Sequence, residues 1–312
     1  MDPLQRWLAH GHRRLLRLDQ PEYPALLRHL ADAPRVLYVD GDAGLLWRPT
    51  IAIVGSRRPT AGGLDNARAF AGALARAGWC IASGMAAGID TAAHLGALDA
   101  GGTTIAVLGT GIDVPYPPGN ARTMARIAEQ GVVVSEYAPG HPMQAFQFPQ
   151  RNRIVAALSL GTLVVEAQYK SGALITARLA TGAGREVFAI PGSIHNPMAR
   201  GCHRLLRDGA TLVESPGEIV AALAPLANAY ADDLRSRLHV PTSPHDALQQ
   251  SFTCMDADTQ RLWHALGHDP TPMETLVTRT GLTAAKLASI LLVMELEGRV
   301  VSQHGRYTRK SS

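Results

Sequence analysis

The sequence contains few cysteines and no long apolar runs. Only Cys80, Cys202 and Cys254 occur among its 312 residues, and no pair has a C-x-x-C spacing. Such usage is typical of the reducing cytoplasm rather than of a disulfide framework. No apolar run approaches the roughly 18 residues that a membrane span needs, and the start of the chain lacks the apolar core of a signal peptide. We therefore expect a cytoplasmic protein without a membrane segment.

Several common catalytic and cofactor motifs are also missing. The chain contains no GxxxxGK[ST], no HExxH and no GxSxG, which argues against P-loop nucleotidases, zincins and α/β-hydrolases. A dinucleotide fold needs GxGxxG after its first strand, where this chain has GSRRPT at residues 55–60. His195, Cys202 and His203 fit no common zinc spacing. We expect neither a cofactor nor a metal.

Lysine is scarce, at positions 170, 286 and 310 only, although Lys and Arg together number 30. The formal charge of +4 mildly favours an anionic partner. Because the composition is biased towards arginine over lysine, a lone arginine is weak evidence for an anion-binding site. Clustered arginines, or arginines placed against the local electrostatics, are more informative.

Strand-like and helix-like patterns alternate along most of the sequence. Apolar runs of strand length alternate with helical patterns, at residues 50–55, 79–84, 104–109, 131–136, 162–167, 186–192 and 210–213. This alternation predicts an α/β protein whose parallel sheet is covered on both faces. We expect a doubly wound, Rossmann-like domain over residues 46–228, preceded by an N-terminal extension, residues 1–45, that contains a short helix and a strand.

A smaller domain is predicted at the C-terminal end. Residues 229–255 gather Pro, Ser and charge and are interpreted as a linker. Residues 256–312 show three helical patterns and a two-strand ribbon turning at residues 304–305, which predicts a winged helix. Its third helix offers only Lys286 and Ser289 early, and its apolar face is expected to be buried, so we expect no sequence-specific reading of duplex DNA. That face comprises Leu287, Ile290, Leu291 and Met294.

Cations and small hydroxyl residues follow several of the predicted strands. In open α/β sheets, ligands bind at these carboxyl ends, and backbone amides with arginine forks suit phosphate. Arg151 and Arg153 lie at a helix that we expect to begin near Asn152. A cation there is unfavourable by roughly 0.3–1 kcal/mol unless an anion lies beside it. The alternatives are ion pairs with Glu136 or Glu166, or exposure to solvent.

Aromatic residues make up only 5% of the chain, yet some of them gather near these arginines. Arginines interleaved with rings suit single-stranded nucleic acid, whose bases stack on the rings. Phe148 is either a base-stacking residue or a core residue, whereas Phe146 is expected to anchor its loop in the core. Asp90 and His94 have the i,i+4 spacing of an acid–base pair, but structural roles are expected for both.

The motifs taken in order resemble one family. They are IVGSRRPT, SGMAAGIDTAAHLGAL, AVLGTGIDVPYPPGN, VVSE, FPQRNRIVAALSLGTLVVEAQYKSGALITARLA and FAIPGS with GCHRLLRDGA. Together they are similar to the DNA-processing protein A (DprA/Smf) family over about residues 21–215, and the run over residues 148–180 is the most specific. The resemblance implies a non-enzymatic protein of natural transformation that binds and shields incoming single-stranded DNA, forms a homodimer and loads the RecA recombinase.

The resemblance also implies a set of DNA-contacting positions. By position, the family's phosphate-binding pocket falls on Gly55, Ser56, Arg57, Ser83, Gly84, Gln150, Arg151, Asn152, Arg153, Lys170, Ser171 and Gly172. The chain departs from the family at Ala61, where an aromatic is common, and at His203, where an asparagine is usual. Replacement of Arg57 or Arg153 by alanine is expected to weaken binding to all sequences alike, without a change in melting temperature.

Two further interpretations are open. Lysine-decarboxylase-like phosphoribohydrolases have a related sheet and a PGGxGTxxE motif, whose tail is echoed by Gly161, Thr162 and Glu166 without the double glycine. A nucleotide hydrolase is therefore the alternative function. Independently, an apolar stripe on the last helix of the large domain could face a second protomer rather than the core; it consists of Ile219, Leu223 and Leu226.

Overall fold

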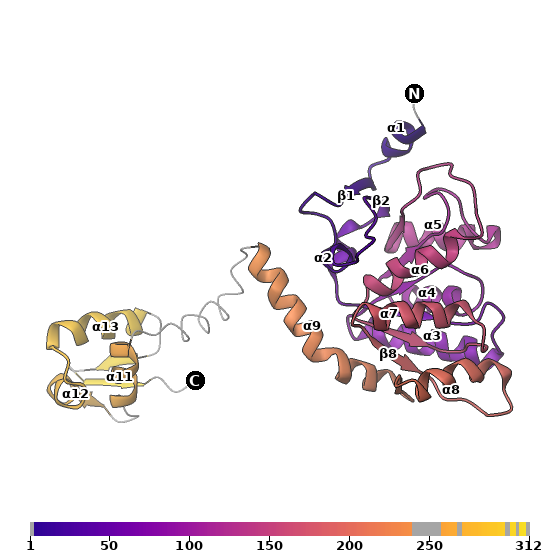
Figure 1. The fold of residues 1–312 in the computed structure, drawn as a ribbon. Coiled ribbons are helices and arrows are strands. Elements are labelled where there is room, and N and C mark those ends of the chain that lie inside the picture. Colours follow the sequence, from indigo (N-terminus) through magenta and orange to yellow (C-terminus); the bar gives the residue numbers. More distant parts are fainter. Residues whose placement is uncertain (1–2, 239–256, 267–269, 297–299, 304–305, 310–312) are drawn as a thin grey trace. The chain divides into compact units, whose positions relative to one another are not determined.

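The protein is described by a computed structural model that covers residues 3–238, 257–266, 270–296, 300–303 and 306–309. The chain divides into two compact units, Met1–Asp233 and Leu234–Ser312. Figure 1 shows the elements of both units, coloured along the sequence. Within the described residues, no helix is both long enough and apolar enough to cross a bilayer.

The first unit is built on a nine-stranded sheet with the order β1-β2-β6-β5-β4-β3-β7-β8-β9. From β3 onward every neighbouring pair is parallel, and the order reverses at β3, which lies between β4 and β7. The predicted doubly wound α/β fold is confirmed. The strands are β1 (Arg13–Arg17), β2 (Val36–Gly41), β3 (Thr50–Val54), β4 (Cys80–Ser83), β5 (Thr104–Val107), β6 (Val132–Ser135), β7 (Gly161–Val164), β8 (Glu186–Ala189) and β9 (Thr211–Leu212).

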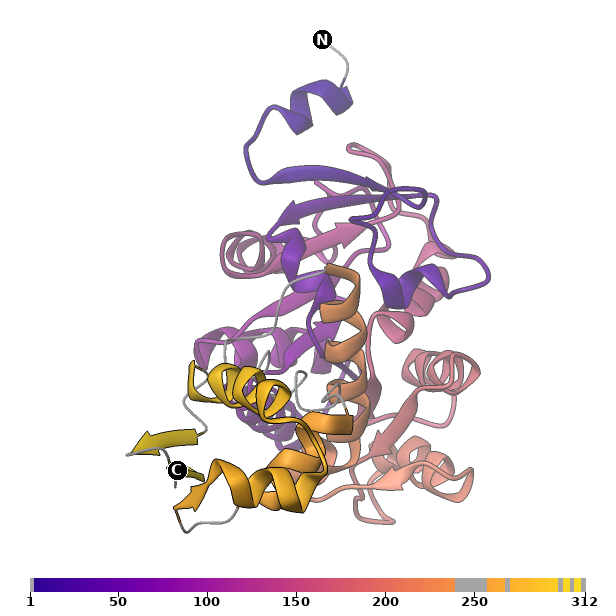
Figure 2. The same cartoon turned by 90° about the vertical axis from the view of Figure 1, so that its left-hand side faces the viewer.

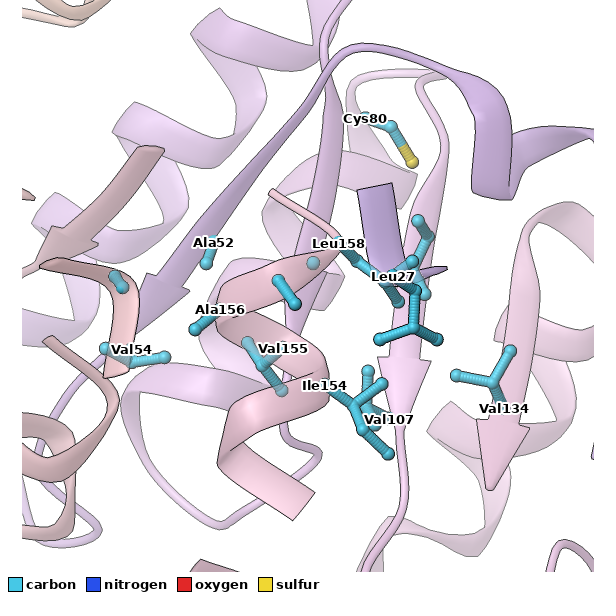
Figure 3. Close-up of a cluster of buried hydrophobic side chains, with 14 of the residues drawn as sticks. Leu27, Ala52, Val54, Cys80, Val107, Val134, Ile154, Val155, Ala156 and Leu158 are labelled. Carbon is cyan, nitrogen blue, oxygen red and sulfur yellow. The ribbon is translucent and has the colours of Figure 1, made fainter. Parts of the chain in front are cut away.

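Helices cover both faces of this sheet because its central strands are apolar on both sides (Figures 1 and 2). One face carries α3 (Ala61–Arg76), α4 (Ile89–Asp99) and α5 (Ala121–Gln130), and the other carries α6 (Gln147–Ala157), α7 (Gly172–Gly182) and α8 (Arg200–Arg207). Figure 3 shows α6 burying Ile154 and Val155 against side chains of the sheet. Full burial of such a side chain contributes about 1.5–3 kcal/mol.

The N-terminal residues are part of the sheet rather than an extension beside it. After α1 (Pro3–Leu8), β1 pairs antiparallel with β2, and β2 pairs antiparallel with β6. The predicted short helix and strand are present as α2 (Ala25–Arg28) and β2. Side chains of β2 alternate between half-buried and buried, so one face of this strand packs on the core, and β1 forms the edge of the sheet.

The last helix of the first unit differs from the prediction in two ways. Helix α9 runs over Pro216–Leu238, so residues 229–238 of the predicted linker are helical; Ala, Leu and Arg, which recur there, have favourable helix propensities. The rest of the predicted linker lies outside the described residues. Ile219 and Leu223 are fully buried in the core, whereas Leu226 is 44% exposed. Two of the three residues in the proposed partner-facing stripe are therefore core residues.

The second unit confirms the predicted winged helix. Helices α11 (Ala257–Ala265), α12 (Met273–Thr280) and α13 (Ala284–Leu296) pack beside a sheet with the order β10-β12-β11. These strands are β10 (Thr271–Pro272), β12 (Arg306–Arg309) and β11 (Val300–Gln303). As expected, Leu287, Leu291 and Met294 are buried and Ile290 packs against them. The predicted turn at residues 304–305 lies outside the described residues.

Candidate functional site

A cleft of about 620 Å³ lies at the carboxyl ends of β3, β4 and β7. This is the switch point of the sheet, where open α/β folds bind their ligands. Nine of the residues predicted from the sequence line it: Gly55, Ser56, Arg57, Gly84, Phe148, Arg151, Asn152, Ser171 and Gly172. Four others do not: Ser83, Gln150, Arg153 and Lys170. Ser83 is buried in the sheet, where its hydroxyl donates to the carbonyl of Ile53 at 2.6 Å.

The loop after β3 presents two cations to the cleft. The Ser56 amide donates to the Glu166 carbonyl at 2.7 Å, and the Ser56 carbonyl accepts from the Ile89 amide at 3.1 Å. These bonds fix the backbone from which the exposed side chains of Arg57 and Arg58 project. Neither arginine makes an ion pair with any residue that the structure describes. Both guanidinium groups are therefore available to an anionic ligand.

Glu166, at the end of β7, holds the neighbouring loops together. Its carboxylate accepts from the Thr60 amide at 2.9 Å, from the Thr60 hydroxyl at 2.7 Å and from Asn196 Nδ2 at 3.3 Å. Thr60 also caps α3, because its hydroxyl accepts from the Gly63 amide at 3.0 Å. Glu166 thus supports the β3 loop and forms no ion pair with Arg151 or Arg153.

The loop after β4 is shaped by backbone contacts to Asp90. The Asp90 carboxyl accepts from the amides of Gly84 at 3.2 Å and Ala86 at 3.3 Å. Between them, Met85 adopts the left-handed conformation at φ 63°, and Asn120 Nδ2 donates to its carbonyl at 3.0 Å. Burial raises the pKa of Asp90, and the nearby Arg151 opposes this shift. Asp90 therefore has a structural role, as expected.

His94 is not paired with Asp90. Its Nδ1 lies 2.7 Å from Thr104 Oγ1, and that hydroxyl donates to the Ile81 carbonyl at 2.6 Å. Because the Thr104 proton is used, His94 Nδ1 is the donor in this contact. Burial lowers the pKa of His94 to about 3. The structural interpretation of this pair is confirmed, and the partner of His94 is the Thr104 hydroxyl.

Arg151 forms the floor of the cleft. Helix α6 begins at Gln147 rather than near Asn152, so Arg151 lies in its second turn. The side chain is 3% exposed, and its Nη1 donates to the carbonyls of Gly84 and Val107 at the ends of β4 and β5. Burial lowers the pKa of Arg151 to about 10, an effect that Asp90 opposes. A Cβ atom at Gly84 would overlap the guanidinium, so a larger residue at this position would have to displace the Arg151 side chain.

Arg153 lies outside the cleft and is ion-paired. Its Nη2 lies 2.7 Å from Glu136 Oε2, and its Nε lies 2.8 Å from Asp32 Oδ2. Both the Arg153 and Glu136 side chains are only 15% exposed. Of the alternatives that the sequence left open, the ion pair with Glu136 is the one that the structure contains.

The two phenylalanines have opposite environments. Phe148 is half-buried at the cleft wall, with its ring centroid 4.9 Å from that of Tyr116 and 5.8 Å from the Arg57 guanidinium carbon. Beyond it lies a second cavity of about 130 Å³, which Phe148 and Arg57 also line. Phe146 is 58% exposed, so the expectation that it anchors the loop in the core is wrong. The buried residue at this helix start is Gln147.

The N-terminus of α7 opens onto the far wall of the cleft. Ser171 caps the helix by accepting from the Ala173 amide at 3.3 Å, and Gly172 follows it. The positive end of a helix dipole with free amides favours anions.

The cleft is also lined by Asp90, Gln168, Thr176 and Met198, which were not among the site residues predicted from the sequence. Of these, only Asp90 could have been found from the sequence, because it lies at the start of α4. The fold and this cleft define a Rossmann-like protein with an arginine-lined groove at the switch point of its sheet.

Comparison with known proteins identifies the family. The model of DNA recombination-mediator protein A matches residues 14–224, and that of the DprA winged helix domain matches residues 240–306. The chain therefore belongs to the DprA family of DNA-processing proteins. Protein Smf of Escherichia coli is 38% identical over 97% of this chain and 79% of its own length, and DNA processing protein DprA of Streptococcus pneumoniae is 46% identical over 64% and 70%.

Two solved structures show the same similarity. DprA from Streptococcus pneumoniae superposes with a TM-score of 0.66 at 42% identity, covering 71% of this chain and 78% of that one. DNA processing protein A from Helicobacter pylori, reported for its unique single-stranded DNA binding mode, has a TM-score of 0.63 at 32% identity, over 70% of this chain and 98% of that one.

Proposed function

We propose that this protein binds single-stranded DNA in the cleft at the switch point. The observation that carries the proposal is the grouping, around one cavity, of the unpaired guanidinium groups of Arg57 and Arg58, the ring of Phe148 and the N-terminus of α7. Cations and helix amides suit phosphates, and an accessible ring suits an unpaired base. Binding of this kind is tolerant of sequence, because every base has a π-face.

The biological role that we infer follows from membership of the family. The protein protects incoming DNA in the cytoplasm during natural transformation and loads the RecA recombinase onto it. It acts as a homodimer, since two aligned clefts on one strand raise avidity. Light scattering at micromolar concentration tests this state: a dimer mass is expected, and a monomer mass contradicts it.

The protein acts without catalysis in this proposal. The buried acids nearest the cleft are already used, Asp90 by loop amides and Glu166 by Thr60 and Asn196. Neither carboxylate is placed as a free general acid or base. The alternative is a phosphoribohydrolase-like enzyme, and incubation with nucleoside monophosphates separates the two. We expect no free base to be released; release of base supports the enzyme.

A mobility-shift comparison tests the binding proposal. Labelled single-stranded DNA and duplex DNA of equal length are titrated with the full chain at the same salt concentration. We expect a shift of the single strand at protein concentrations that leave the duplex free, because the bases of a duplex are stacked and cannot reach Phe148. Equal affinity for both, or preference for the duplex, contradicts the proposal.

A further inference from the structure

An additional basic strip continues from the cleft towards α8. It consists of Tyr169, Lys170, Arg200 and Arg204, and we name it the α8 strip. Tyr169 and Lys170 belong to the loop between β7 and α7, while the two arginines lie one turn apart on the same face of α8. None of these four residues lines the cleft.

Backbone contacts place the start of α8 directly against the cleft wall. The Ala167 amide donates to the Met198 carbonyl, and the Gly201 amide donates to the Ala167 carbonyl, both at 2.7 Å. A Cβ atom at Gly201 would lie 2.6 Å from that carbonyl oxygen, so this close approach depends on glycine. Because Met198 itself lines the cleft, the strip begins where the cleft ends.

The strip combines an exposed ring with available cations. Tyr169 is 56% exposed, and the Arg204 guanidinium carbon lies 5.0 Å from its ring centroid. Arg204 also contacts Asp208 at 3.4 Å, between two well-exposed side chains, which is a weak interaction in water. Among the described residues, neither Lys170 nor Arg200 has an ion-pair partner. The charge of the strip is therefore largely uncompensated.

We propose that the α8 strip binds the stretch of a single strand that extends beyond the cleft. Tyr169 offers a face on which one base stacks, and Arg200 and Arg204 meet the phosphates that follow. A single strand fits this surface better than an acidic protein segment, because the strip combines an exposed ring, which suits a base, with cations, which suit phosphates. The inference rests on the proposed function of the cleft and assigns it a second, adjoining contact surface.

The length of the DNA oligonucleotide distinguishes binding at the α8 strip from binding at the cleft. Anisotropy titrations use labelled oligo-dT of about 5 and about 20 nucleotides, of which only the longer can extend past one cleft. The test variant is Arg200→Ala/Arg204→Ala. The charge-matched control is Arg68→Ala/Arg76→Ala, which removes two exposed arginines from α3 on the opposite face of the sheet. Melting temperatures confirm that all variants fold.

The expected result is a length-dependent loss. The test variant binds the long strand roughly tenfold more weakly, with a salt slope shallower by about 1.4, and binds the short strand within about twofold of the unmodified protein. Arg200→Lys/Arg204→Lys retains the charge and binds the long strand nearly normally. If the Arg200→Ala/Arg204→Ala variant keeps its affinity for the long strand, or loses affinity equally at both lengths, the proposal for the α8 strip is wrong. Failure of the unmodified protein to bind either strand refutes the function of the cleft instead.

Discussion

The same positive charge occurs in three environments around the cleft, at Arg57, Arg151 and Arg153. Arg57 is exposed and unpaired in the described structure, Arg151 is buried against two backbone carbonyls, and Arg153 is held by two carboxylates. Their sequence context, GSRRPT and FPQRNR, does not distinguish these environments. Arg57 is therefore suited to ligand binding, whereas Arg151 and Arg153 also support the fold.

Removal of Arg153 is expected to destabilise the protein. Arg153→Ala leaves the largely buried Glu136 carboxylate without its partner, and an unpaired buried charge is expensive. We expect the free energy of unfolding to fall by about 1–3 kcal/mol, measured by urea denaturation. This differs from the sequence-based expectation of an unchanged melting temperature. Glu136→Gln/Arg153→Gln, which removes both charges together, should lose less; an equal or larger loss contradicts the ion-pair account.

The lowered pKa of His94 predicts that the free energy of unfolding depends on pH. Its pKa is about 3 in the folded protein and about 6.5 in an unfolded chain. Between these values the unfolded state binds more protons, so the free energy of unfolding falls as the pH drops, by about 1.4 kcal/mol per pH unit from this group. The stability is fully present above about pH 6.5.

The variant His94→Asn isolates this contribution. Its amide can still donate to Thr104 Oγ1, but it does not titrate. Urea unfolding between about pH 4 and about pH 7 should give a shallower dependence on pH for the variant than for the unmodified protein. Identical slopes would mean that His94 does not titrate differently in the two states.

At the scale of elements, periodicity located most of the fold. The seven parallel strands were predicted because each is a short, continuous apolar run, which the chemistry of a doubly covered sheet demands. The start of α6 was missed because its first turn, QFPQ, carries a proline and no side-chain cap, so the apolar pattern becomes visible only from Ile154. The extension of α9 was missed because Pro225 and later charges resemble a linker.

The candidate site was predictable only in part. Residues at strand ends, such as Gly55 and Gly84, follow from topology, because parallel strands bring their carboxyl ends together. The pairing of Arg153 with Asp32 joins residues 121 positions apart in the sequence, and no local pattern carries such information. Lys170 and Gln150 are neighbours of the cleft in sequence, yet their side chains do not line it.

The winged helix is expected to be dispensable for single-strand binding. Lys286, the early cation of α13, is ion-paired with Asp258, and Arg309 donates to the carbonyl of Trp263. A chain ending near Asp256 should therefore retain most of its single-strand affinity. We expect a change of less than tenfold in anisotropy titrations against the full chain. A larger loss would place the DNA site in the second unit.

At the scale of the whole molecule, the proposed binding is mainly electrostatic. If about four phosphates are neutralised per protomer, the logarithm of the affinity should fall with the logarithm of salt concentration at a slope near −3, since each phosphate contributes about −0.7 for a single strand. Titrations at several salt concentrations measure the slope. An affinity that does not depend on salt contradicts a phosphate-binding cleft.

The central claim is that the switch-point cleft is the single-strand site, and Arg57 tests it most directly. The measurement is the dissociation constant of Arg57→Ala for several single-stranded sequences, beside Arg76→Ala as a control at the far end of α3. We predict a roughly tenfold loss for every sequence with Arg57→Ala, no loss with Arg76→Ala, and an unchanged melting temperature for both. Equal affinities of the two variants would contradict the assignment of the cleft.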